Sequence, residues 1–66
     1  MTNFIKLGTL VKLSATTTRF YLHDIQYDIT EFYSISQILD NKQLLKMKVL
    51  QFKSAGRNIL YVDIEE

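Results

Sequence analysis

His23 and Asp24 are the first residues to consider for chemistry, because His23 is the only histidine of the 66-residue chain and a carboxylate follows it directly. Such a pair can act as a base and its orienting group when both side chains point the same way. Adjacent residues of a strand point to opposite faces, so these two would meet only in a turn or a bulge. The sequence places no serine, threonine or lysine as a nucleophile beside them. We therefore expect a surface or bulge histidine and no catalytic residue.

Three carboxylates close together in the sequence raise the question of a metal site. Asp24, Asp28 and Glu31 lack the central glycine of a calcium-binding loop, so we interpret them as a solvated face. The chain has no cysteine, and one histidine does not anchor a zinc ion. Gly8 and Gly56 lie too far apart to form a phosphate-binding loop. The sequence thus predicts no metal, no cofactor and no nucleotide hydrolysis.

Lysine and arginine concentrate in residues 42–57, whereas the segment before them is acidic. Basic side chains near aromatic rings are typical of a strand surface that binds nucleic acid. The candidate surface for a partner or for nucleic acid consists of Lys42, Lys46, Lys48, Phe52, Lys53, Arg57 and Tyr61. A net charge of +1 is low for a domain that binds by neutralising phosphates. Alternatively, the acidic C-terminus pairs with these lysines across a hairpin, or the lysines protect a sheet edge from aggregation.

The N-terminal half of the chain is expected to consist of strands, which would position some of these residues. Apolar residues of one parity over 4–13 predict a strand, in which Gly8 marks a bulge, a bend or a close backbone approach. Residues 19–29 are rich in aromatic and β-branched side chains, but their apolar set changes parity near His23 and Asp24. Either one bulged strand or two strands with a tight turn at these two residues would explain the change.

The second half predicts one helix and a hairpin. Thr30 is a candidate N-cap for a short helix over 31–39, which Asp40 and Asn41 would end. A long strand then begins near residue 45, and a flip of its apolar face near Leu50 predicts a bulge. Ser54, Ala55 and Gly56 form the expected hairpin loop, with Gly56 at the position that requires positive φ. The closing strand presents Leu60, Val62 and Ile64 on one face.

This element order predicts a single α+β domain over residues 1–66. Its expected architecture is a small antiparallel sheet or a partly open barrel of 4–5 strands. One short helix (31–39) would lie between the N-terminal strands and the C-terminal hairpin. The likeness to a five-stranded partly open barrel is topological, and a fold of this kind does not fix a function.

The small size of the chain bears on its function. A domain of 66 residues is marginally stable alone, and without disulfides or metals it gains stability from dense packing, oligomerisation or a partner. Long strands without proline also leave pairing edges that invite a partner. We therefore expect a soluble, cytoplasmic protein without a membrane segment, which acts through protein–protein interaction as a regulator, adaptor or inhibitor and forms a homodimer. Such chains are typical of phages and mobile elements. Nucleic-acid binding by the basic hairpin 42–57 is the alternative.

Overall fold

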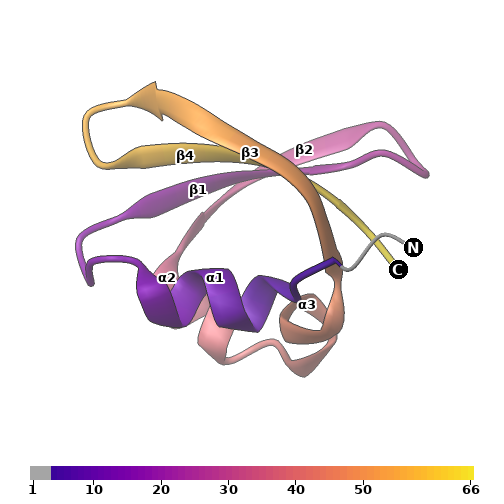
Figure 1. Cartoon of the computed structure of the whole chain (residues 1–66), viewed down its shortest axis with the longest axis horizontal. Helices are drawn as coiled ribbons and strands as arrows, with labels where there is room; N and C mark the ends of the chain where they lie inside the picture. The colour runs from indigo at the N-terminus through magenta and orange to yellow at the C-terminus, as the bar shows by residue number, and fades with distance from the viewer. Residues whose placement is uncertain (1–3) are drawn as a thin grey trace.

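The computed structural model describes residues 4–66, which form one four-stranded sheet and three short helices (Figure 1). The helices all lie on one side of the sheet, below it in Figure 1, and the other side is uncovered. In chain order the elements are α1 (Leu7–Leu13), β1 (Arg19–Asp24), β2 (Ile29–Ser34), α2 (Ile35–Leu39), α3 (Lys42–Lys46), β3 (Lys48–Gly56) and β4 (Ile59–Glu65). The α+β class predicted from the sequence is confirmed.

The strand order in the sheet is β2-β1-β4-β3, and the sheet is open. β1 pairs with β2 and β3 pairs with β4 in antiparallel fashion, but the central pair of β1 and β4 is parallel. The sheet is therefore mixed, where the sequence suggested antiparallel strands or a partly open barrel. The physical reason is the long connection through β2, the two helices and β3, which lets β4 enter beside β1 in the same direction.

Helix α1 occupies residues for which the sequence predicted a strand, so the strand over 4–13 is wrong. Leu7, Leu10 and Val11 are buried, and their spacing of three and four residues is that of one helix face. Leu7 and Val11 also lie an even number of residues apart, as on one face of a strand, so the sequence pattern was compatible with a strand as well. Leu13, the last residue of the predicted apolar face, is 80% exposed.

Gly8 lies where α1 packs against α3. A Cβ atom placed on Gly8 would lie 3.3 Å from the carbonyl oxygen of Leu45, which is closer than most side chains tolerate. The glycine therefore provides a close backbone approach, one of the three roles that the sequence suggested for it, and it does so between two helices.

Residues 19–34 form a hairpin of two strands, so neither alternative from the sequence, one bulged strand over 19–29 or two strands joined by a turn at His23 and Asp24, is correct. The turn covers residues 25–28, so His23 and Asp24 end β1 and do not form the turn themselves. Asp24 instead starts it, because its Oδ1 accepts a hydrogen bond of 2.9 Å from the backbone N–H of Gln26. Asp28 ends the turn with a φ of 53°.

The predicted helix 31–39 is divided between a strand and a helix. Residues 29–34 pair with β1 as β2, because their β-branched and aromatic side chains suit a sheet, and α2 begins only after Ser34. Ser34 and Gln37 form a capping box at this start. Asn41, which the sequence assigned to the end of the helix, caps a second helix, α3: its Oδ1 accepts from the backbone N–H groups of Gln43 and Leu44.

The C-terminal hairpin follows the sequence prediction most closely. The pairing of β3 and β4 shifts between Val49 and Gln51, where a bulge was predicted, and again near the turn. Gly56 has the expected positive φ, of 153°, but the turn itself lies two residues later, with Asn58 at 57°. β3 begins at residue 48 because α3 occupies the first residues of the predicted strand.

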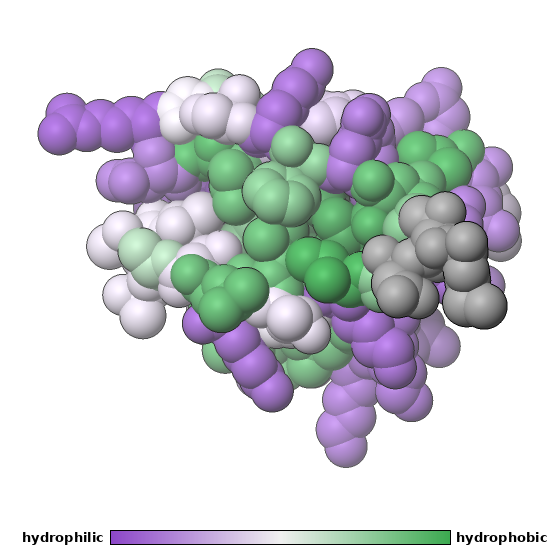
Figure 2. Space-filling view, viewed as in Figure 1, coloured by the Kyte–Doolittle hydropathy of each residue, from purple (hydrophilic) through white to green (hydrophobic). Residues whose placement is uncertain are grey.

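The core lies between the sheet and the helices, where apolar side chains form a band in Figure 2. Its strand residues alternate, as in any half-buried sheet. The buried side chains are Leu7, Leu10, Val11, Phe20, Leu22, Ile38, Met47, Val49, Val62 and Ile64. Leu60 packs against them, so the predicted face of the closing strand is confirmed. Within residues 4–66 no helix is long and apolar enough to cross a membrane.

Candidate binding surface

The uncovered face of the sheet carries a row of side chains that runs across all four strands. Tyr21 of β1 pairs with Phe32 of β2 on one side and with Tyr61 of β4 on the other, and Tyr61 pairs with Lys53 of β3. The neighbours of Tyr21 along the chain are buried on the helix side, so alternation directs Tyr21 to the uncovered face. We call Phe32, Tyr21 and Tyr61 the aromatic row.

Two rings of the aromatic row, those of Tyr21 and Phe32, contact each other and are accessible, whereas Tyr61 is partly buried. The ring centroids of Tyr21 and Phe32 lie 4.6 Å apart with an interplanar angle of 47°. Tyr21 is 37% exposed and Phe32 is 43% exposed. The Nζ atom of Lys53 lies 5.5 Å from the centroid of the Tyr61 ring, within range of a cation–π interaction. The row therefore offers a mainly apolar strip that ends in a positive charge.

A second row of the same face contains a hydrogen-bonded polar network around His23. Its Nε2 lies 2.8 Å from Oδ1 of Asp28, and its Nδ1 lies 2.9 Å from Oδ1 of Asp63. The other carboxylate oxygen of Asp63 accepts a hydrogen bond from the side-chain amide of Gln51. A neutral imidazole donates only one hydrogen bond, so two carboxylate partners require the imidazolium form. His23 thus joins the turn after β1 to β4 and β3.

The protonation of this network follows from its contacts. The hydrogen bond with Asp28, and after it the one with Asp63, raises the pKa of His23 above its ordinary value. The Gln51 hydrogen bond, with a smaller effect of His23, lowers the pKa of the Asp63 carboxyl. Both shifts favour the charged forms, so the network is an ion-paired structural link across three strands.

The polar network differs from the His23–Asp24 pair considered from the sequence. Asp24 bonds to the backbone of Gln26, whereas Asp63, the partner of His23, is 40 residues away in the sequence. No local pattern could have shown this contact. Among residues 4–66 no group of three or more histidine, cysteine or acidic side chains is arranged to hold a metal ion.

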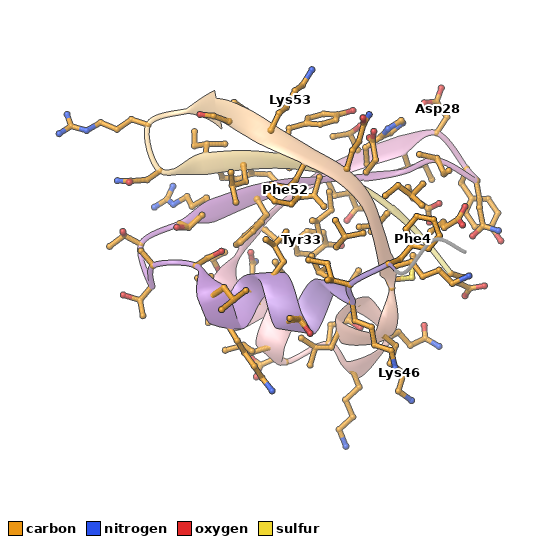
Figure 3. All side chains as sticks on the ribbon, viewed as in Figure 1. Phe4, Asp28, Tyr33, Lys46, Phe52 and Lys53 are labelled. Atoms are coloured by element: carbon orange, nitrogen blue, oxygen red, sulfur yellow. The ribbon has the colours of Figure 1, made fainter. Side chains whose placement is uncertain are left out.

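The seven residues of the sequence-predicted surface are distributed over several parts of the molecule. Lys53 and Tyr61 meet on the uncovered face, and Lys48 stands opposite Glu65 in the register of β3 and β4, as expected for pairing with the acidic C-terminus. Lys42 and Lys46 belong to α3, on the helix side. Figure 3 shows Lys46 and Lys53 projecting from opposite sides of the molecule.

The remaining two predicted residues also lie away from the aromatic row. Arg57 is exposed in the turn between β3 and β4. Phe52 is paired with the buried Val62, which places it on the helix side of the sheet, where it is 52% exposed (Figure 3). On the aromatic row the structure therefore places Lys53 beside Tyr61, and it adds Tyr21 and Phe32, which the sequence did not single out.

The two edges of the sheet differ in their surroundings. The start of β3 is paired with the segment before α1: the N–H of Leu7 donates to the carbonyl of Met47 at 2.8 Å, and that of Val49 donates to the carbonyl of Ile5 at 2.9 Å. Farther along, β3 carries exposed lysine and has two register shifts. β2 pairs with β1 without any shift, and no strand of the described chain pairs with its other side.

Comparison with known proteins gives no further guide to this surface. No protein-family model, curated protein or solved structure matches the chain. The uncovered face and the sheet edges are therefore the features of the molecule that bear on its function.

Proposed function

We propose that this chain is a non-catalytic binding protein that acts through protein–protein interaction, as a regulator, adaptor or inhibitor inside the cell. The observation that carries the proposal is the aromatic row on the uncovered face. Tyrosine and phenylalanine are enriched in protein interfaces because they bury a large area at a small entropic cost. Tyr21 and Phe32 stand accessible on strands of a regular sheet, so a partner would meet them in a fixed arrangement.

The charges around the row favour a protein partner over nucleic acid. Lys53 and Arg19 contribute positive charge to the uncovered face, but Asp28 and Asp63 contribute negative charge beside them. Phosphate groups would be repelled by these carboxylates, whereas a protein surface can offer both signs. The net charge of +1 gives no general attraction for a polyanion.

Single-stranded nucleic acid is the second candidate because of one specific observation. Three rings followed by a lysine across adjacent strands are what stacking of successive bases needs. This candidate uses Lys53 and the aromatic row, since Lys42 and Lys46 belong to α3 and Arg57 lies in the turn between β3 and β4.

Affinity capture from a cell extract with matched tyrosine variants tests the proposal. Tyr21→Ala removes a ring of the row, whereas Tyr27→Ala removes an equally large ring, 70% exposed, from the turn before β2. We expect captured protein to fall about tenfold or more with Tyr21→Ala, as for a central interface residue, and to be unchanged with Tyr27→Ala. Equal loss with both variants, or captured material that disappears after nuclease treatment, would contradict a protein-binding role of the row.

A further inference from the structure

β2 lacks the exposed lysines, the register shifts and the covering segment that protect the edge of β3. Edge strands are normally shielded by lysine, proline, bulges or a covering segment, because their free backbone groups otherwise pair with another chain. β3 has exposed lysines, two register shifts and a covering segment at its start. β2, Ile29–Ser34, has no lysine, arginine or proline, and all six of its residues pair in register with β1.

We infer that β2 is a homodimerisation edge, on which the β2 strand of a second copy pairs in antiparallel fashion to form one continuous sheet of eight strands. This inference rests on the proposed binding role, for which it names the first partner. The strand fits its own copy because Glu31 is its only charged residue and the others are uncharged, mostly β-branched or aromatic. Phe32, which is 43% exposed, would become covered.

Symmetry restricts the register of such a pair. A two-fold axis relates the two strands, and residues directly opposite each other must both be hydrogen-bonded or both be non-hydrogen-bonded. Because these two kinds of residue alternate along a strand, a residue cannot lie opposite the copy of its direct neighbour. One residue of β2 must therefore lie opposite its own copy. The two registers with the largest overlap centre on Glu31 or on Phe32. Centring on Glu31 sets two carboxylates against each other, which is unfavourable, so the Phe32 register remains.

The Phe32 register has consequences on both faces of the sheet. On the uncovered face Phe32 meets the partner's Phe32, which joins the two aromatic rows into one strip across both copies. On the helix side Glu31 stands opposite the partner's Tyr33. Within one chain the Tyr33 hydroxyl already donates to Oε2 of Glu31 at 2.7 Å, so the two side chains suit each other chemically.

Single cysteines test the register, since the chain has no cysteine of its own. With Phe32→Cys the two sulfur atoms would lie opposite each other, within reach of a disulfide. In Thr30→Cys, on the same face of β2, they would be separated by four residues, about 13 Å along the strand. We expect oxidation to convert Phe32→Cys to covalent dimer at least tenfold faster than Thr30→Cys. Equal rates, or a faster reaction of Glu31→Cys, would overturn the register.

A second pair of variants retains the phenylalanine. In the Phe32 register Thr30 lies opposite the partner's Ser34, so a mixture of Thr30→Cys and Ser34→Cys chains should form the mixed disulfide at least tenfold faster than either chain alone forms its own. A mixture that yields no more mixed disulfide than random pairing would overturn the inference.

Light scattering over a range of concentrations tests the dimer itself. Phe32→Lys places two positive charges at the centre of the interface, and Phe52→Lys makes the same change at a similarly exposed position of the other edge strand. We expect Phe32→Lys to raise the dissociation constant of the dimer at least tenfold and Phe52→Lys to leave it unchanged. If the native chain is monomeric, the inference is overturned, and the proposed function still stands if Tyr21→Ala reduces partner capture. If the dimer is intact but no partner is captured through Tyr21, the proposed function is contradicted instead.

Discussion

His23 shows how one residue connects parts of the sheet that are distant in sequence. Its two ring nitrogens bond to carboxylates of the β1–β2 turn and of β4, and both bonds form together only when the ring is charged. Lys53, from β3, also interacts favourably with the Asp63 carboxylate. The charged ring is therefore a structural element of the uncovered face.

The stability of the fold should depend on the protonation of this histidine. The pKa of His23 is raised in the folded chain, so its contribution is complete below its unfolded pKa of about 6.5 and is lost as pH rises through the folded value. The pKa of Asp63 is lowered, so its contribution is present above about pH 4 and is lost as pH falls through the folded value. Between these limits both stabilise the fold.

Urea denaturation from pH 5 to pH 8.5 measures this dependence. We expect the midpoint of the native chain to fall as pH rises above about 6.5, and that of His23→Gln to stay flatter over the same range. A native midpoint that rises with pH in this range, or an equal decline in the variant, would show that His23 is not held as the cation.

At the scale of elements, the first helix was hidden by an ambiguity of spacing. The spacing of Leu7 and Val11 fits the same face of a strand and the same face of a helix. The burial of Leu10 fits only the helix. The C-terminal hairpin was predictable because Gly56 and the alternation of β4 are local signals. The second helix, α3, was missed because asparagine is common both after the end of a helix and at the N-cap of the next, and Asn41 was assigned only the first role.

The contact of α1 with α3 should be sensitive to side-chain size at Gly8. Gly8→Val forces the two helices apart, because even a Cβ atom would lie 3.3 Å from the Leu45 carbonyl oxygen. We expect a loss of about 1–3 kcal/mol in the free energy of unfolding, as for overpacking. Thr9→Val, at the exposed neighbouring position of α1, serves as the control for adding valine to this helix. Denaturant titration of both variants checks the difference, and equal stability of the two would refute the tight contact.

At the scale of the whole molecule, the aromatic row could not be predicted from the sequence. Alternation within residues 19–24 suggests that Tyr21 faces away from the core, but its neighbours depend on the strand order. The parallel pairing of β1 with β4 brings Tyr61 beside Tyr21 across 40 residues of chain. The basic segment 42–57 was visible in the sequence, yet its division between α3, β3 and a turn disperses its charges.

Site-specific photo-cross-linking in cells measures most directly whether the uncovered face binds a protein. A benzophenone amino acid replaces Tyr21 in one variant and Tyr27, which lies outside the row, in another. The proposal predicts a discrete protein adduct from position 21 that resists nuclease and is absent from position 27. Adducts of equal yield at both positions, or adducts at position 21 that consist of nucleic acid, would contradict it.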